Sequence, residues 1–332
     1  MEMSQAIPVS VIVAMRNSET TIVACLEGLI AQEYPIREII VLDNVSTDGS
    51  VGLVEDFARS SPIALRLIRQ SVNGGLTTSY NLGAELAASA LLVFVHSDSM
   101  LPSTNELGRL VGPLLSDSQV VAAYPILMMP QDVWERFPFW QKYLFARVAL
   151  TEKPSMCGKF DCIRKEAYQR VGRHNTKRFT VSCGYGGEDS DLHARLIKAG
   201  KIVGTSARVI HLHDLSGDYG LRSLFGTRKM LARTYGKILV FQGVRPVVEK
   251  LPLLFKPMLA CFLFAPIPMW GIAGGYLLFS LLHSMRLYAS PLTRMNVRIL
   301  LVPLIDMALI FYETFWFIEG LLTSPADVKR SD

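Results

Sequence analysis

The chain has few charged residues and lacks the cysteine spacings that stabilise small domains. Asp, Glu, Lys and Arg make up 19% of its 332 residues, against about 25% in typical soluble domains. The five cysteines form no Cys-x-x-Cys pair, which excludes a disulfide scaffold and argues against a zinc ribbon. Because 50% of the residues are hydrophobic, disorder is excluded as well. The length allows about two domains. The excess of apolar residues must be buried, either in the protein or in a membrane.

Charge is missing altogether from one stretch near the C-terminus. Residues 257–282, 26 in number, contain no charged side chain. As a helix they would span about 39 Å, against a hydrocarbon core of about 30 Å. A second apolar stretch is interrupted by three acids, Asp306, Glu313 and Glu319. We therefore predict two membrane-associated helices, at about 253–283 and 299–322.

Acidic residues are nearly absent between Arg222 and Arg298. Eleven Lys and Arg side chains accompany one acid, Glu249, so this segment carries +10, the whole chain +5 and the remainder −5. Basic residues beside apolar helices suit anionic lipid headgroups, each contributing about 1 kcal/mol near a membrane surface. Nucleic acid also attracts clustered Lys and Arg. The interleaved apolar segments favour membrane lipids, and we expect no nucleic-acid partner.

The predicted helices have three possible arrangements. Two crossings would place the three arginines of residues 286–298 on the far side, against the positive-inside tendency. Pro266 and Pro268 would instead allow a re-entrant hairpin, with the second helix along the interface and its acids facing protein or water. A buried helical extension or dimer interface is the third. No basic stretch precedes the first apolar run, so we expect the N-terminal part at the cytoplasmic face of the inner (plasma) membrane.

The first hundred residues alternate between short apolar runs and segments with helical spacing. The runs of strand length are residues 9–14, 38–42, 65–69 and 91–95, and the helical segments are residues 19–32, 50–60 and 76–90. This alternation predicts an α/β fold with a mostly parallel sheet and helices on both faces. Ligands gather at the carboxyl ends of such strands. The polar residues just beyond these ends are Arg16, Asn17, Asp43, Asn44, His96, Ser97 and Asp98.

The same segments carry a recognisable combination of motifs. Asn17 follows the first strand, a Gln-x-x-Pro element follows at 32–35, and Asp-x-x-Ser-x-Asp-Gly follows at 43–49. A block Asn-Gly-Gly-Leu with further Asn and Gly residues occupies 73–83. Together these motifs resemble the opening of family 2 glycosyltransferases, and the resemblance extends through about residue 215. The family usually has a basic residue where this chain has Tyr80.

The resemblance implies a GT-A fold, a Rossmann-like and mostly parallel sheet with helices on both faces, over residues 1–215. About 1–125 would bind a nucleotide sugar, and 126–215 would supply the acceptor side and the base. Residues 216–332 would form a basic linker and the membrane-associated helices. The donor-binding residues that it implies are Ala14, Arg16, Asn17, Asp43, Asn73, Gly75, Asn81, His96, Ser97 and Asp98. Taken alone, the Asp43 segment is also typical of a plain turn.

In this family a divalent cation usually binds an Asp-x-Asp motif after an apolar strand. Here Asp98 is the second acid, and His96 replaces the first. By resemblance Asp98 is a metal ligand, completed by His211 or His213 after a predicted strand at 207–210. The ion would be Mn²⁺ or Mg²⁺, and a nitrogen ligand would favour Mn²⁺. The alternatives are a degraded motif and histidines that only hydrogen-bond a loop.

Two adjacent acids, Glu188 and Asp189, precede a predicted helix at 192–199. They resemble the Glu-Asp motif of the family, in which the Asp is the catalytic base and the Glu positions the acceptor. Mutual repulsion and burial raise carboxylate pKa values, and a general base works best with a pKa near ambient pH. Acids that complement a helix dipole are the alternative.

Aromatic residues crowd into positions 134–145. Such a density is typical of lipid headgroup level or of a core. The residues that we expect to contact the acceptor or a phosphate are Trp134, Trp140, Gly158, Arg164, Arg228 and Arg233.

The resemblance thus implies an inverting, metal-assisted enzyme of cell-envelope glycan synthesis. It would move a sugar from a nucleotide-diphosphate sugar to a hydroxyl of a lipid-linked or membrane-proximal glycan, with Asp189 as base. A polyprenyl-phosphate glycosyltransferase is the nearest alternative, although an ionised phosphate acceptor needs no base. A non-catalytic membrane scaffold or sugar-binding protein with a degraded metal motif is the alternative from another class.

Overall fold

The computed structural model describes residues 7–147, 149, 151–154, 156–179, 187–213, 218–241 and 247–323. The chain divides into two compact units, each described here by itself. The sheet unit comprises residues 1–130, 150–182 and 188–216, and the helical unit comprises residues 131–149, 183–187 and 217–332. The aromatic segment at 134–145, which we expected on the acceptor half, belongs to the helical unit.

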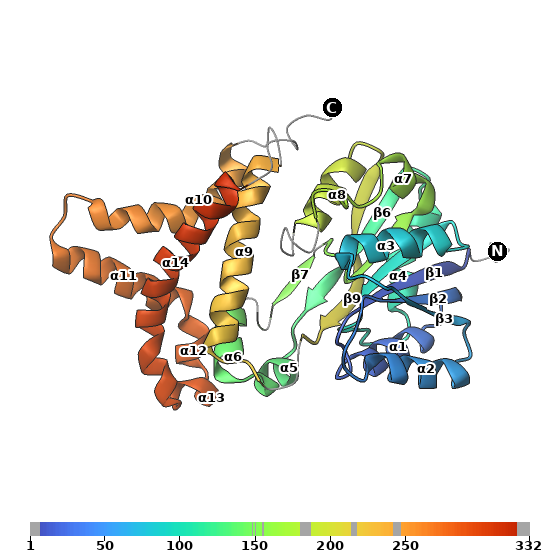
Figure 1. Ribbon diagram of the computed structural model, residues 1–332, viewed down its shortest axis with the longest axis horizontal. Helices are drawn as coiled ribbons and strands as arrows, with labels where there is room; N and C mark the ends of the chain where they lie inside the picture. The colour runs from blue at the N-terminus through green and yellow to red at the C-terminus, as the bar shows by residue number, and fades with distance from the viewer. Residues whose placement is uncertain are drawn as a thin grey trace. The chain divides into compact units, whose positions relative to one another are not determined.

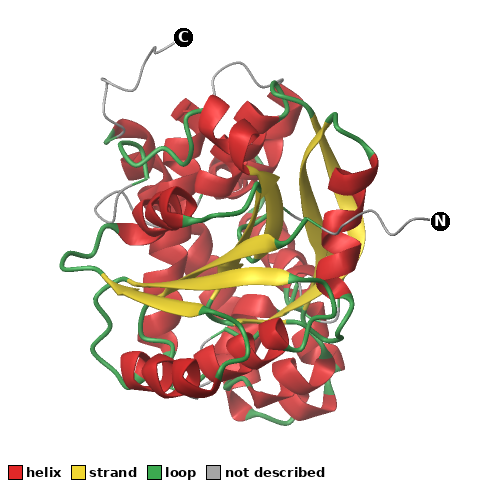
Figure 2. Ribbon diagram, turned by 90° about the vertical axis from the view of Figure 1, so that its right-hand side faces the viewer, coloured by secondary structure: helices red, strands yellow, loops and turns green. Residues whose placement is uncertain are grey.

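The sheet unit is built on one mixed sheet (Figures 1 and 2). Within the described residues it has nine strands in the order β3-β2-β1-β4-β8-β6-β9-β5, with β7 paired to β6. The strands are β1 Val9–Met15, β2 Ile36–Asp43, β3 Leu65–Arg69, β4 Leu91–His96, β5 Ser99–Met100, β6 Val120–Met128, β7 Glu152–Pro154, β8 Phe160–Arg164 and β9 Lys201–His211. Strands β1 to β4 pair in parallel, as do β6 and β9, while β8 runs antiparallel to its neighbours. The predicted α/β fold is confirmed, but the sheet is mixed, because four of its eight described strand pairings are antiparallel.

Both faces of the sheet are covered by helices, which is why its central strands are continuously apolar. Val11 and Val13 face a core that includes side chains of α1 (Ile22–Ile30), α2 (Ser50–Ser60) and α4 (Glu106–Ser116). Ile12 and Ile40 face a second core with α3 (Gly75–Leu86), α7 (Lys165–Arg170) and α8 (Glu188–Leu196). The predicted strands and helices of the first hundred residues lie within a few residues of these bounds.

The pairing register gathers polar strand ends at one edge of the sheet. Ala14 of β1 pairs with His96 of β4. On its other side β1 ends with Met15 beside Asp43 of β2. Farther along, His211 at the end of β9 pairs with Ser99 of β5. Residues far apart in sequence are therefore neighbours at this edge, as expected for parallel strands.

The helical unit consists mainly of helices from the C-terminal third. They are α5 Gln131–Arg136, α6 Phe139–Phe145, α9 Leu221–Phe241, α10 Val247–Cys261, α11 Met269–His283, α12 Met285–Ala289, α13 Pro291–Arg294 and α14 Val302–Leu322. The two longest, α9 and α14, lie side by side (Figure 1). A Cβ on Gly236 would lie 2.1 Å from the carbonyl oxygen of Phe317, and one on Gly320 would lie 2.2 Å from that of Arg233. The two backbones therefore touch because both contact positions are glycine.

The predicted helix at 253–283 is not one helix. It breaks between Phe264 and Met269, at Pro266 and Pro268, into α10 and α11. The two halves contact each other, because the Tyr276 hydroxyl donates to the carbonyl of Leu259 at 3.0 Å. Proline removes a backbone donor and clashes with the preceding turn, which accounts for a break at the two prolines on which the re-entrant alternative rested. Among the described residues, one helical stretch, Val297–Leu322, is long and apolar enough to cross a membrane.

All three acids of the second apolar stretch face protein, which is one of the two surroundings that the re-entrant alternative gave them. Asp306 accepts hydrogen bonds from the hydroxyls of Tyr143 and Ser280, each at 2.5 Å. Glu313 accepts from Lys256 at 2.5 Å. The two oxygens of Glu319 accept from Arg233 at 2.5 and 2.7 Å. Each carboxylate thus has a partner within an otherwise apolar bundle, which offsets the cost of its burial.

Gly83→Ala should destabilise the protein although alanine favours helices by about 1 kcal/mol. A Cβ at Gly83 in α3 would lie 2.3 Å from Ile12 Cγ2 and 3.0 Å from Leu42 Cδ2, and such overpacking costs about 1–3 kcal/mol. Gly108→Ala in α4 is the matched control, because nothing lies within 4 Å of its Cβ position. Thermal unfolding should give a lower Tm for Gly83→Ala and an equal or higher Tm for Gly108→Ala. Equal shifts in both variants would contradict the packing argument.

Candidate active site

A pocket of about 210 Å³ lies at the polar edge of the sheet. Its described lining is Ala14, Arg16, Asn17, Ser18, Thr20, Thr21, Leu76, His96, Ser97, Asp98 and His213. Six of the expected donor-binding residues are among them: Ala14, Arg16, Asn17, His96, Ser97 and Asp98. Ser18 and the two threonines were missed by the sequence analysis. They follow Asn17 along the chain, and this adjacency was the only signal for them.

The loop that carries Arg16 and Asn17 is held by the turn after β2. Asn17 has a positive φ of 48°, and its side-chain oxygen accepts from the Thr47 amide at 2.9 Å. Its own amide donates to the Ser46 hydroxyl at 2.9 Å. Asp48 lies one residue before the cap of α2 and accepts from the Ser50 amide at 3.1 Å. The 43–49 motif therefore shapes the first loop of the pocket.

Four residues expected at the donor do not line this pocket. Asp43 is buried and accepts from the Ser46 amide at 3.2 Å, which is turn chemistry. Asn73 accepts from the amide of Gly75 at 3.1 Å and so begins α3. Asn81 accepts from the Tyr168 hydroxyl at 2.6 Å and lies in α3. Asp43, Asn73, Gly75 and Asn81 thus form hydrogen bonds within the protein outside this pocket, and their donor-binding roles stay predictions.

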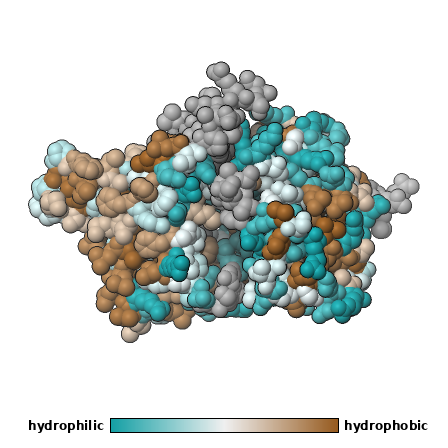
Figure 3. Space-filling model, viewed as in Figure 1, coloured by the Kyte–Doolittle hydropathy of each residue, from teal (hydrophilic) through white to brown (hydrophobic). Residues whose placement is uncertain are grey.

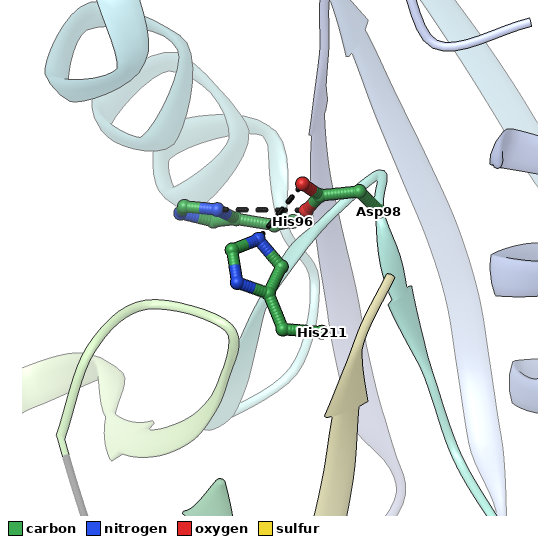
Figure 4. Close-up of side chains that lie close together, drawn as sticks. All are labelled: His96, Asp98 and His211. Carbon is green, nitrogen blue, oxygen red and sulfur yellow. Dashed lines mark hydrogen bonds and ion pairs between the residues drawn. The ribbon is translucent and has the colours of Figure 1, made fainter. Parts of the chain in front are cut away.

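Three side chains converge beside the pocket in a geometry that suits a metal ion (Figure 4). One ligand atom from each of His96, Asp98 and His211 lies within 4.8 Å of the others. His211 Nε2 lies 2.8 Å from one Asp98 oxygen, and His96 Nδ1 lies 3.9 Å from the other. The Leu212 amide donates to the Asp98 carbonyl at 2.8 Å, so the end of β9 is anchored to this loop.

The charges of this group fit a divalent cation. Burial acts to raise the pKa of Asp98, but the neighbouring His211 and His96 outweigh it and the pKa lies well below 3.8. Burial, with Lys159 nearby, lowers the pKa of His96 to about 3. At neutral pH the group therefore offers one carboxylate and neutral imidazoles, which are the ligand forms of these side chains.

The two ring nitrogens of His96 have different neighbours. Nδ1 faces Asp98, whereas Nε2 is buried on the side of Gly158 and has no hydrogen-bond partner among the described residues. Two nitrogens and a carboxylate oxygen suit Mn²⁺ better than Mg²⁺, which prefers oxygen. His213, the other histidine expected to bind metal, packs its ring 3.6 Å from that of His211 and lines the pocket. The structure thus brings His96 into the group with Asp98 and His211.

Asp189 lies beside the same group, across Gly158. A Cβ at Gly158 would lie 3.1 Å from Asp189 Oδ1 and 3.4 Å from His96 Nε2, so only glycine leaves this space open. Gly158 also has a positive φ of 68°, a conformation that side chains disfavour. Asp189 and Glu188 begin α8. The expected base and the expected acceptor residue Gly158 are therefore adjacent to His96.

Burial and the neighbouring Glu188 raise the pKa of Asp189 well above 3.8. Burial also raises the pKa of Asp161, whose carboxylate accepts from the Gly158 amide, to about 7. Lys159 is a positive counterpart that the sequence analysis missed. Burial lowers its pKa, but nearby groups that include Cys157 and Asp189 outweigh this and raise it above 10.5. Lys159 therefore keeps its charge beside the acids.

Tyr80 explains the departure from the family pattern. Its hydroxyl donates to the Gly158 carbonyl at 2.8 Å, and its ring lies 6.2 Å from that of His96. This buried side chain holds the loop between Asp189 and His96. The sign of this role in the sequence was that Tyr80 stands where the family usually has a basic residue.

Arg164 is not part of the site. It pairs with Leu91, at the opposite end of β4 from His96. Its guanidinium donates to the carbonyls of Val120, Leu114 and Asp117, so it anchors the start of β6. The other expected acceptor residues, Trp134, Trp140, Arg228 and Arg233, lie in the helical unit. Both tryptophans are buried there, which favours the core interpretation of the aromatic segment.

Comparisons with known proteins bear on the family and the fold of the chain. The family model "Glycosyl transferase family 2" matches residues 10–172. The uncharacterized glycosyltransferase YibD of Escherichia coli strain K12 is 35% identical over 89 residues, which cover 27% of this chain and 25% of that protein. The match thus spans about a quarter of that relative.

Two solved structures show the fold. The mannosyltransferase PcManGT from Pyrobaculum calidifontis, in complex with GDP-Man and Mn²⁺, has a TM-score of 0.57 and 18% identity, covering 98% of this chain and 89% of that one. GalNAc-T7 with UDP, GalNAc and Mn²⁺ has a TM-score of 0.51 and 18% identity, covering 69% of this chain and 48% of that one. The fold is GT-A. Residues 10–172 of the chain form a family 2 glycosyltransferase domain.

Asp98→Asn should weaken Mn²⁺ binding at least about tenfold, because the amide has no charge to offer the ion. Asparagine keeps the size of the side chain and an oxygen for His211, so the fold should persist. Electron paramagnetic resonance of free Mn²⁺ measures the affinity. The control is Asp56→Asn, an acid of α2 that is 68% exposed. An unchanged affinity in Asp98→Asn would remove this metal site.

Proposed function

We propose that this chain is an inverting, metal-assisted glycosyltransferase that uses a nucleotide-diphosphate sugar. The observation that carries the proposal is the closeness of Asp189 and the His96–Asp98–His211 group on the two sides of Gly158. A single carboxylate beside a cation-binding group suits a direct displacement, with one group for each end of the reaction. PcManGT and GalNAc-T7 are reported with nucleotides and Mn²⁺, which supports the donor class and the ion.

The donor would bind in the pocket at the strand ends. Ala14, Arg16 and Asn17 line its β1 side, and Ser97 and Asp98 line its β4 side. A divalent ion held by His96, Asp98 and His211 would offset the charge of the leaving diphosphate. Lys159, charged and close to these acids, adds positive potential next to the same group.

Asp189 would accept the proton of the acceptor hydroxyl. The acceptor oxygen forms its bond to the sugar carbon while the bond from that carbon to the diphosphate oxygen breaks, and the diphosphate leaves with the electron pair. The proton ends on the Asp189 carboxylate. One displacement inverts the configuration of the sugar carbon, and a raised pKa suits this base.

The acceptor that we propose is a lipid-linked or membrane-proximal glycan. The helical unit supports it, because large apolar side chains are exposed over α11 to α14, among them Trp270, Leu278, Leu300 and Phe315 (Figure 3). Exposed apolar area of this kind fits a bilayer. We propose that this unit associates with a membrane, with the sheet unit on its cytoplasmic side.

The rival functions differ in what they need from the site. A polyprenyl phosphate acceptor is already ionised, so the adjacent acids Glu188 and Asp189 would be unnecessary. A sugar-binding scaffold would not need the three-ligand group. A thermal-shift screen of nucleotide sugars with Mn²⁺ and Mg²⁺ tests the proposal, because a donor that binds the folded state raises its Tm. No shift with any nucleotide sugar would overturn it.

Asp189→Asn should reduce sugar transfer about 10²- to 10⁴-fold, because the amide cannot take the proton. Binding of the donor should not change, since Asp189 does not line the donor pocket. Release of the nucleoside diphosphate measures transfer, and Asp117→Asn at a solvent-facing pair with Lys201 is the control. Near-normal transfer by Asp189→Asn would favour the phosphate acceptor.

As the pH is lowered, transfer should begin to fall at a higher pH than it would if an ordinary aspartate were the base. The raised pKa means that Asp189 is protonated, and so unable to act as base, at pH values where a free aspartate is ionised. The acid limb of kcat/KM should therefore lie well above pH 4, and the residual transfer of Asp189→Asn should lack it. A profile of the unmodified protein that stays flat down to pH 4.5 would contradict this role.

A further inference from the structure

The helical unit contains a second pocket, of about 290 Å³. Its polar lining consists chiefly of three cations and one carboxylate: Arg147, Arg228, Lys256 and Glu313. They come from the segment after α6, from α9, from α10 and from α14. Aromatic side chains, among them Phe255 and Phe317, form the apolar part of the lining.

The cations of this pocket outnumber their counter-charge. Lys256 Nζ lies 2.5 Å from a Glu313 oxygen, and Arg228 Nε lies 3.7 Å from the same oxygen. One carboxylate therefore serves two cations, and Arg228 Nε is buried without a hydrogen-bond partner among the described residues. Arg147 is exposed and has no ion pair in the described part of the chain. Among the described lining residues, three positive groups and one negative leave two charges unmatched.

The buried Arg228 guanidinium is costly unless an anion completes it, whereas Arg147 is exposed to solvent. Guanidinium groups are suited to phosphate, because their planar N–H groups match its oxygens. A phosphate or diphosphate carries the two negative charges that the pocket lacks. A monocarboxylate would supply one.

The aromatic wall indicates that the anion carries hydrocarbon. Phe255 is 51% exposed, and it lies on α10, in the bundle whose exposed residues are largely apolar (Figure 3). A free inorganic anion would gain nothing from this wall. An amphiphile with a phosphorylated head would place charge on the cations and its chain along the aromatic rings.

We propose that this pocket binds the phosphate or diphosphate group of an amphiphile. The inference rests on the proposed function in one respect, since a lipid-linked acceptor is one source of such a group. A phospholipid of the bilayer is the other source. Both sources offer phosphate oxygens to the guanidinium groups, but the phosphodiester of a phospholipid carries one negative charge, whereas a prenyl diphosphate carries at least two.

Binding of farnesyl diphosphate to the full-length chain in detergent micelles tests the proposal. Isothermal titration should give a Kd at least tenfold lower for farnesyl diphosphate than for farnesol, which has the same chain without charge. It should also be at least tenfold lower than that for inorganic pyrophosphate, which has the charge without the chain. Equal affinity for farnesol, or for pyrophosphate, would overturn the proposal.

Arg147→Gln and Arg228→Gln should each weaken binding of farnesyl diphosphate at least fivefold, and the double variant more. Both should fold, because Arg147 has no ion pair to lose and Lys256 continues to neutralise Glu313. Arg222→Gln is the matched control, since this arginine is exposed on the same helix α9 and lies outside the pocket. An equal loss of affinity in Arg222→Gln would show general charge attraction and would contradict a specific site.

Competition separates the two sources. Displacement of farnesyl diphosphate by phosphatidylglycerol would assign the pocket to bilayer lipid, and resistance to it would assign the pocket to a prenyl-type phosphate; both outcomes support the site. The thermal shift with nucleotide sugars and Mn²⁺ reports the sheet unit separately. A chain that binds the donor but not farnesyl diphosphate loses only this inference, and the reverse result loses only the proposed function.

Discussion

The contact between Asp98 and His211 is the interaction on which the candidate site depends. It joins residues 113 positions apart at a distance of 2.8 Å and couples the loop after β4 to the end of β9. This contact depends on the strand order of the sheet, which places β5 beside β9. Once these ends meet, the low pKa of Asp98 and the neutral imidazoles follow from their closeness and burial.

Two residues, Gly158 and Tyr80, connect this site to Asp189 at the start of α8. Gly158 leaves open the space between Asp189 and His96, and Tyr80 holds its carbonyl from behind. In the helical unit, Gly236 and Gly320 likewise leave space for the close approach of α9 and α14. Each acid of α14 accepts a hydrogen bond from a donor on another helix. Both units thus combine close backbone approach with paired polar groups, which is what burial of charge requires.

The strands and helices of the first hundred residues were predictable because both faces of the sheet are covered, and continuous apolar runs mark such strands. Pocket residues directly after β1 and β4 were predictable for the same reason. The roles of Asp43 and Asn81 were harder, because a motif position does not tell whether a side chain faces the ligand or braces the loop behind it. Lys159 and Arg164 belong to one short segment, yet they lie at opposite ends of β8, since a strand carries its residues along the sheet.

The sequence by itself determined the α/β pattern, the family motifs and the segregation of basic charge, and it offered the proline break within the first apolar stretch as one of three alternatives. These are properties of neighbouring residues, and local geometry and hydropathy suffice for them. Only the tertiary structure decided that His96 stands with Asp98 and His211, that Asp189 meets them across Gly158, and that three cations share Glu313. Distance between side chains depends on how strands and helices pair across the chain, and burial, which shifts pKa values and leaves cations unmatched, exists only after they have packed.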